Sequence, residues 1–190
     1  MGAGWRSGRS IGIAGLAGWL GLVLLLALPS ASAQLEGAMT RYEAGLRSGS
    51  GDGFDSLELY YRQAAPGLDE VVLARLGLDA WRARWAFALG GWSGDHDDTA
   101  VIALGPAFER RLGDAPLRLS LGIQPTLISR HDGNGRDLGG PVQFTSHAAI
   151  AWAPPGALVI GLRLQHTSNA GIYTHNPGVD IAAVAIGYGF

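Results

Sequence analysis

Hydrophobic and polar residues alternate along much of this chain. The clearest case is residues 117–127, where every second residue is apolar and the residues between are polar or small. The apolar set is Leu117, Leu119, Leu121, Ile123, Pro125 and Leu127, and the other set is Arg118, Ser120, Gly122, Gln124 and Thr126. Successive side chains of a β-strand point to opposite faces, so the pattern predicts a strand with one apolar face.

The same alternation recurs in residues 142–152 and 158–164, with Ser146 as a polar exception on the apolar side. Weaker patterns predict strands at 39–48, 55–63, 81–92 and 99–110, and a last strand covers about 178–190. The count is therefore eight. Residues 66–80 stay open between a helical turn and, from Arg75 onward, a longer third strand.

Strands of about ten residues separated by turns are typical of transmembrane β-barrels. The connections at 112–115 and 153–156 are tight, as periplasmic turns are, whereas 93–98, 131–140 and 169–177 are longer and polar, as extracellular loops are. No run after residue 33 approaches twenty apolar residues. We predict an all-β fold, an eight-stranded antiparallel transmembrane β-barrel over residues 34–190, whose closure pairs every backbone polar group.

Five aromatic residues are candidates for the girdles of such a barrel at the membrane interfaces. They are Trp81, Trp85, Trp92, Trp152 and Tyr188. The alternative is ordinary packing inside a soluble, lipocalin-like barrel.

The last strand favours the membrane barrel. Val184, Ile186, Tyr188 and Phe190 alternate with alanine and glycine, and this resembles the assembly signal of bacterial outer-membrane proteins. It predicts recognition by the barrel-assembly machinery through Phe190 and a location in the outer membrane of a Gram-negative cell.

The first 33 residues have the order of a secretory signal peptide. Arg6 and Arg9 precede an apolar stretch from residue 11 to 28, and a small-residue cleavage site ends at Ala33. A retained membrane anchor is the alternative reading, since the apolar run approaches spanning length. Without Arg6 and Arg9 the 14 basic residues become 12, against 16 acidic ones, a net charge of −4.

The chain contains no lysine and no cysteine. No basic block suggests binding to nucleic acid. Disulfides and thiolate metal sites are excluded.

Three polar residues are predicted on the apolar, lipid-facing side near one end of two neighbouring strands. Continuing the parity of residues 158–164 places His166 and Ser168 there, and counting back from Phe190 places Asp180 there as well. Residues i and i+2 of a strand lie about 6.5–7 Å apart, so an imidazole and a hydroxyl can meet. A nucleophilic hydroxyl needs such a base, and a carboxylate can orient that base. Polar residues at strand ends also commonly just meet headgroups or water, so the pattern alone leaves the choice open.

Other polar residues have simpler explanations. The run Asp95-His96-Asp97-Asp98 and the pair His131-Asp132 are expected to be solvated loop charges rather than cation sites. His147 falls on the luminal face, where we expect a hydrogen-bonded structural histidine.

The motif around these residues resembles the lipid A 3-O-deacylases (PagL type), outer-membrane barrels of eight strands. The resemblance rests on His166-Thr167-Ser168-Asn169-Ala170-Gly171, on Asn176-Pro177-Gly178 and on Asp180, and it is strongest over residues 162–190. It implies hydrolysis of the ester-linked acyl chain at the 3-position of lipid A, with lipopolysaccharide in the bilayer as substrate and no metal or cofactor.

The resemblance also implies a role for each matching residue. Ser168 would be the nucleophile, His166 the general base and then acid, and Asp180 the orienting carboxylate, where the family usually carries Glu. Asn169 and Asn176 would bind the oxyanion or order the site. Because Asp is one methylene shorter than Glu, contact with His166 needs a close strand register.

Two other functions stay open at this point. One is a non-enzymatic small outer-membrane barrel with a structural or adhesive role, and the other is a different outer-membrane acyl hydrolase. The sequence leaves open the preferred acyl length, regulation in the membrane and the oligomeric state, including a homodimer.

Overall fold

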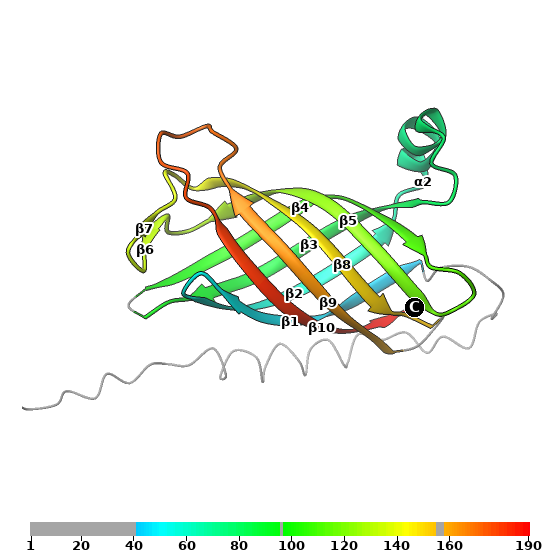
Figure 1. Cartoon of the computed structure of the whole chain (residues 1–190), viewed down its shortest axis with the longest axis horizontal. Helices are drawn as coiled ribbons and strands as arrows, with labels where there is room; N and C mark the ends of the chain where they lie inside the picture. The colour runs from blue at the N-terminus through cyan, green and yellow to red at the C-terminus, as the bar shows by residue number, and fades with distance from the viewer. Residues whose placement is uncertain (1–40, 96, 155–157) are drawn as a thin grey trace, which may run out of the picture. The chain divides into compact units, whose positions relative to one another are not determined.

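The computed structural model describes residues 41–95, 97–154 and 158–190, and the predicted signal peptide at 1–33 lies outside the described residues. Eight long antiparallel strands close into a barrel, in which β1 also pairs with β10 (Figure 1). The strands are β1 (Tyr42–Gly51), β2 (Phe54–Ala64), β3 (Arg82–Ser93), β4 (Asp98–Arg111), β5 (Leu117–Ile128), β8 (Val142–Trp152), β9 (Leu158–Ser168) and β10 (Val179–Gly189). The predicted eight-stranded fold is confirmed.

The segment left open by the sequence is helical. It comprises α2 (Pro66–Leu68), the π-helical turn η1 (Asp69–Leu73) and the 3-10 turn η2 (Ala74–Leu76), and β3 begins only at Arg82. Leu73 is buried against Ala65 and Ala83, and the backbone N–H of Ala83 donates to the Asp69 carboxylate (2.5 Å). These contacts hold the helical turns on the barrel end instead of extending the third strand.

A second, two-stranded sheet that the pattern did not predict lies in the connection between β5 and β8. It pairs β6 (Asp132–Gly133) with β7 (Arg136–Asp137). This hairpin and the loop between β9 and β10 lie at one end of the barrel, and α2 lies at the other (Figure 1). Among the described residues, no helix is long and apolar enough to cross a membrane.

The two faces of the strands are as the alternation predicts. Leu162 and Leu164 of β9 and Val184 of β10 are exposed on the outside, whereas Gln124 and Thr126 of β5 are buried inside. Apolar side chains face outward and polar ones inward, the reverse of a water-soluble barrel. The outer surface is therefore suited to hydrocarbon.

Ion pairs occupy the lumen toward the end of the barrel that carries α2. Glu109 is fully buried and contacts Arg62 (2.6 Å) and Arg84 (2.9 Å), and Arg118 pairs with Glu43 (2.5 Å). Buried charges are tolerated when they are paired in this way. Both of these buried carboxylates thus have arginine partners.

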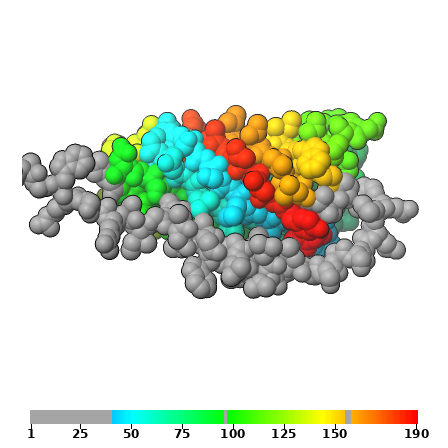
Figure 2. Space-filling view, turned by 90° about the horizontal axis from the view of Figure 1, so that it is seen from below, coloured from blue at the N-terminus to red at the C-terminus, as the bar shows by residue number. Residues whose placement is uncertain are grey.

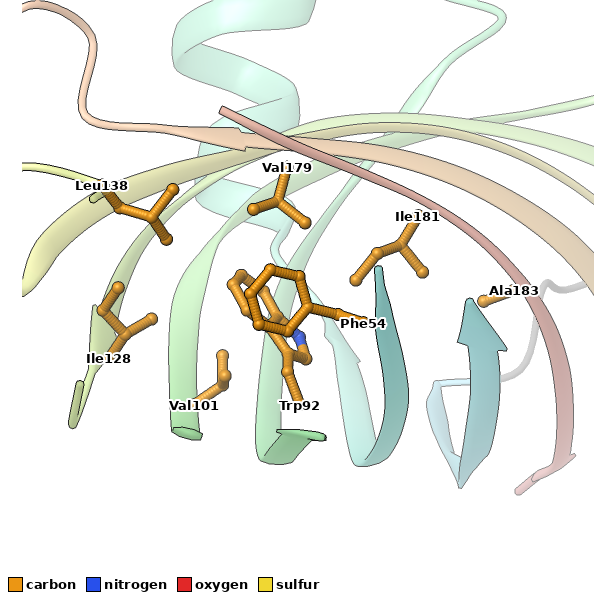
Figure 3. Close-up of a cluster of buried hydrophobic side chains, with 8 residues drawn as sticks. All are labelled: Phe54, Trp92, Val101, Ile128, Leu138, Val179, Ile181 and Ala183. Carbon is orange, nitrogen blue, oxygen red and sulfur yellow. The ribbon is translucent and has the colours of Figure 1, made fainter. Parts of the chain in front are cut away.

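An apolar cluster fills the lumen toward the loop end (Figure 3). Its centre is Phe54 against Trp92, with ring centroids 6.1 Å apart. Trp92 is only 1% exposed, and its indole N–H donates to Glu58 (3.2 Å), so its predicted place in an interfacial girdle is wrong. Trp85 lies seven residues earlier on the same strand, and an odd separation puts the two side chains on opposite faces. Trp85, Trp152 and Tyr188 are exposed on the outside.

Candidate active site

His166 and Asp180 are direct partners across the β9–β10 ladder. The imidazole Nδ1 lies 2.7 Å from Oδ1 of Asp180, and the two side chains are 51% and 74% exposed on the outward face. Opposite the same histidine on β8 is Ser146, whose hydroxyl donates to the backbone carbonyl of His166 (3.4 Å). The three residues form a polar row across three strands on an otherwise apolar surface.

The direct register explains how an aspartate reaches this histidine. Side chains of directly opposed residues in an antiparallel pair have Cβ atoms about 4.5–5.5 Å apart, so a short carboxylate is long enough. The loss of one methylene relative to the Glu implied by the resemblance therefore does not break the contact.

Ser168 is the last residue of β9 and shares the outward face with His166. It is half-buried and lies opposite Phe144 of β8. Among the described residues, no hydrogen bond joins the Ser168 hydroxyl to the imidazole. Because the two Cα atoms are about 6.5–7 Å apart, side-chain rotation can bring them into contact, and such contacts often tighten only when substrate binds.

Gly178 brings the backbone of the β9–β10 loop close to the imidazole. Its φ is +69°, and a Cβ at this position would lie 2.7 Å from Cε1 and 3.3 Å from Nε2 of His166. Only glycine combines this left-handed conformation with so close an approach. The asparagine-proline-glycine turn of the motif is thus part of the wall beside the reactive ring nitrogen.

Asn169 organises that loop from inside. It is fully buried, and its Nδ2 donates to the carbonyls of Leu138 (2.9 Å) and His175 (2.6 Å) while its Oδ1 accepts from Gly171 N–H (2.9 Å). Its own backbone N–H donates to Oδ1 of Asn176 (2.9 Å). Both amide hydrogens of Asn169 are committed, whereas Nδ2 of Asn176 makes no hydrogen bond within the described residues. The geometry therefore favours an ordering role for Asn169 and leaves Asn176 a free donor.

Hollows on the outward surface adjoin this row. One of about 620 Å³ includes Ser146, Leu164, His166, Asp180 and Ala182 among its lining residues. A second, of about 630 Å³, shares Ser50, Leu164 and Ala182 with the first and extends over β1 and β2. Figure 2 shows this side of the barrel, with β10 (red) running between β1 and β2 (cyan) and β9 (orange). The small side chains there leave room for an elongated apolar group beside the histidine.

Comparison with known proteins agrees with this arrangement. The family model described as Lipid A 3-O-deacylase (PagL) matches residues 70–189. The chain belongs to this family. The predicted resemblance is thereby confirmed, and so is the prediction of an enzyme of the carboxylic ester hydrolase class.

Two relatives extend the comparison. The lipid A deacylase PagL of Bordetella bronchiseptica is 28% identical over 176 residues, which cover 88% of this chain and 93% of that protein. The crystal structure of the outer membrane enzyme PagL superimposes with a TM-score of 0.57 at 14% identity, covering 78% of this chain and 99% of that chain. At this identity the superposition shows the fold alone. Membership of the family and the apolar outer face of the barrel agree with the predicted location in the outer membrane.

Several of the other polar residues that the sequence singled out have partners within the protein, and His96 lies outside the described residues. In the outer loops Asp97 pairs with Arg130, and Asp98 accepts from the Ser93 hydroxyl (2.5 Å). His147 is buried in the lumen, where Nε2 lies 3.3 Å from the Ser120 hydroxyl, as expected for a structural histidine.

His131 faces Asp137 of β7 (3.5 Å) instead of its neighbour Asp132. The hydrogen bond from Gly139 N–H lowers the pKa of Asp137, and His131 and His175 lower it further. The carboxylate of Asp137 thus stays charged and links three parts of the outer loops.

The sequence pattern missed two contributions to this site. Ser146 had a detectable signal, because it interrupts the apolar face of its strand at the level of His166. Gly178 belongs to the motif that carries the resemblance, but its approach to the imidazole had no signal, since it depends on how the loop folds back.

Proposed function

We propose that this protein hydrolyses the ester of the 3-linked acyl chain of lipid A through a serine acyl-enzyme. Family membership supports the reaction, and the contact between His166 and Asp180 on the outward face carries the mechanism. An imidazole and a carboxylate facing hydrocarbon serve no purpose in packing, whereas a lipid ester reaches them without leaving the membrane.

Asp180 holds the imidazole in one tautomer. When its carboxylate accepts the Nδ1–H proton, Nε2 carries a lone pair and is the basic nitrogen. Nε2 then takes the proton of the Ser168 hydroxyl as Oγ bonds to the ester carbonyl carbon. The positive charge that develops on the imidazole is stabilised by the adjacent carboxylate.

Collapse of the tetrahedral intermediate breaks the bond between the carbonyl carbon and the 3-oxygen of the sugar. The imidazolium returns its proton to that oxygen, which leaves as a hydroxyl, and the fatty acyl group stays on Ser168. A water molecule then attacks this ester, with Nε2 again as base, and releases the free fatty acid. The cycle balances without any metal.

Two donors next to Ser168 in the loop are suited to the oxyanion. Nδ2 of Asn176 and the backbone N–H of Ala170, whose φ is +53°, make no hydrogen bond within the described residues. Uncommitted donors of this kind stabilise the negative charge of the intermediate, and the loss of one costs about 10²–10³ in rate. Asn169 orders the loop that presents them.

Mass spectrometry of lipid A from Gram-negative cells that express the protein tests the proposal. The expected result is loss of one 3-linked acyl chain with the wild-type protein and an intact lipid A with His166→Ala or Ser168→Ala. His131→Ala, a histidine of the outer loops away from β9, is the matched control and should retain activity. Heat-dependent mobility on gels verifies that each variant is folded.

Unmodified lipid A in cells that contain the folded wild-type barrel would refute the proposal and favour a structural or adhesive role. If lipid A from the Ser168→Ala cells still lacks the 3-linked acyl chain, the proposed activity stands but the acyl-enzyme on Ser168 is refuted.

We also propose that residues 1–33 direct export and that β10 is read by the barrel-assembly machinery. The charged start and apolar run support the first statement. The exposed alternate residues Val184, Ile186 and Tyr188 of β10 support the second. Interrupting the apolar face of β10 with Ile186→Asp should lower the amount of folded barrel in the outer membrane.

A further inference from the structure

The carboxylate beside His166 lies where β10 loses one of its two neighbours. On the β9 side the ladder continues through Asp180 and Val179. On the β1 side the last pair is Ser50 with Ala182, and β1 ends at Gly51. Continuing that register by two residues would place Asp52 opposite Asp180, but Asp52 has a φ of +49° and turns out of the strand.

The side chain of Asp52 replaces the missing ladder partner. Its Oδ2 accepts the backbone N–H of Asp180 at 2.8 Å. A backbone N–H at an unpaired strand edge would otherwise be left to solvent or lipid. A charged acceptor gives a stronger hydrogen bond than a neutral carbonyl.

Arg136 of β7 completes the arrangement from a different loop. Its guanidinium pairs with Asp52 (3.2 Å) and donates to the carbonyl of Gly178 (2.9 Å). Gly178 and Asp180 flank Val179, the first residue of β10. The Asp52–Arg136 pair therefore hydrogen-bonds the backbone on both sides of Val179. The two side chains are each about one-third exposed, at the outer end of the barrel.

We propose that Asp52 and Arg136 are positioning residues that hold Asp180 in contact with His166. The inference rests on the proposed function, since it assigns a purpose to a carboxylate of the proposed triad. Within the described residues, neither side chain makes a hydrogen bond to the imidazole or to Ser168, whereas both bond the backbone of residues 178–180. Three loops, 52–53, 129–141 and 169–178, thereby meet at one catalytic contact.

Kinetics on the full chain in detergent micelles, with lipid A as substrate, test the positioning role. Asp52→Ala and Arg136→Gln should each lower kcat about tenfold or more at unchanged KM, since small misplacements of catalytic groups have effects of this size. Asp52→Asn keeps an oxygen acceptor and tolerates the left-handed conformation, so it should retain about half of kcat. The matched control is Arg130→Gln, which breaks the Arg–Asp pair with Asp97 elsewhere in the loops and should leave kcat unchanged.

A double-mutant cycle shows through which residue the pair acts. In an Asp180→Ala background, Asp52→Ala should have no further effect on kcat, because the group that it positions is gone. Independent, multiplying losses would overturn the inference. So would a raised KM at normal kcat in Arg136→Gln, which would mean that the guanidinium binds the phosphorylated headgroup instead.

A spectroscopic arm separates this inference from the proposed function. In protein labelled with ¹⁵N-histidine, the Nδ1–H signal of His166, assigned with His166→Gln, reports the bond to Asp180 without any substrate. Asp52→Ala should weaken or remove this signal and Arg130→Gln should not. If the wild-type protein leaves lipid A intact but Asp52→Ala removes the signal, the positioning stands and the proposed function fails; an unchanged signal in Asp52→Ala refutes the positioning.

Discussion

Two groups of polar and charged side chains in this barrel differ in how far the protein itself buries them. In the lumen, Glu109 is fully buried among three arginines, and His147 is paired with Ser120. On the outside, His166 and Asp180 pair with each other but remain largely exposed on a surface otherwise covered by leucine, isoleucine and valine. The luminal group is buried inside the protein, whereas the outer group is exposed on the surface that faces the lipid.

This difference separates structure from chemistry in one molecule. A buried charge that loses its partner destabilises the fold, because desolvation is no longer compensated. An exposed pair contributes little to stability, so its presence in an apolar face needs a functional explanation. The two histidines, one in each group, allow the distinction to be tested directly.

The largest expected effect is on catalysis at the outer histidine. His166→Gln should lower the rate of lipid A deacylation by about 10³-fold or more, because the serine loses its base, with an unchanged midpoint of unfolding in urea. His147→Gln should instead lower the midpoint and spare the rate of the folded fraction. Equal effects of the two substitutions on both measurements would contradict the distinction between a catalytic outer histidine and a structural luminal one.

The next largest effect is on stability at the luminal charges. Glu109→Gln should reduce the free energy of unfolding by about 3–5 kcal/mol, since it leaves Arg62, Arg84 and Arg118 without their shared carboxylate. Unfolding in urea followed by tryptophan fluorescence measures this change. Asp114→Asn, in the exposed turn between β4 and β5, is the control and should shift the midpoint little.

A smaller loss of activity is expected at the orienting carboxylate. Asp180→Asn should lower kcat by about 10²-fold, because the imidazolium loses its counter-charge and the tautomer is no longer fixed. Asp180→Glu restores the charge, and its longer side chain matches the residue usual in the family, so it should recover most of the rate. Near-normal kcat in Asp180→Asn would remove this residue from the mechanism.

The smallest of these effects is expected at Gly178, in the loop beside the His166 imidazole. Gly178→Ala places a methyl group against the imidazole and strains a left-handed residue, so kcat should fall about tenfold with a loss of stability near 1 kcal/mol. Gly171→Ala is the matched control, since Gly171 also has a positive φ (+83°) but open space at its Cβ. Similar rate losses in both variants would show that strain, not contact with His166, is responsible.

Much of the fold was predictable because a strand has a two-residue period. Alternation identified the eight strands and sorted lumen from exterior along β5, β8, β9 and β10, and it placed His166, Ser168 and Asp180 on one face. The prediction for Trp92 was wrong because it relied on residue type. Tryptophan suggested a girdle, although the position of Trp92 on β3 directs its side chain inward. Alternation also left residues 66–80 undecided, because helical turns there are held by contacts with Ala65 and Ala83.

By itself, then, the sequence determined which side of each strand meets lipid and which three polar residues share it, because these follow from local geometry and order along the chain. Only the tertiary structure decided that Asp180 opposes His166 directly, that Gly178 touches the ring, and that Asp52 and Arg136 meet behind β10. Such contacts depend on strand register and on loops that are distant in sequence, and no periodic pattern encodes them.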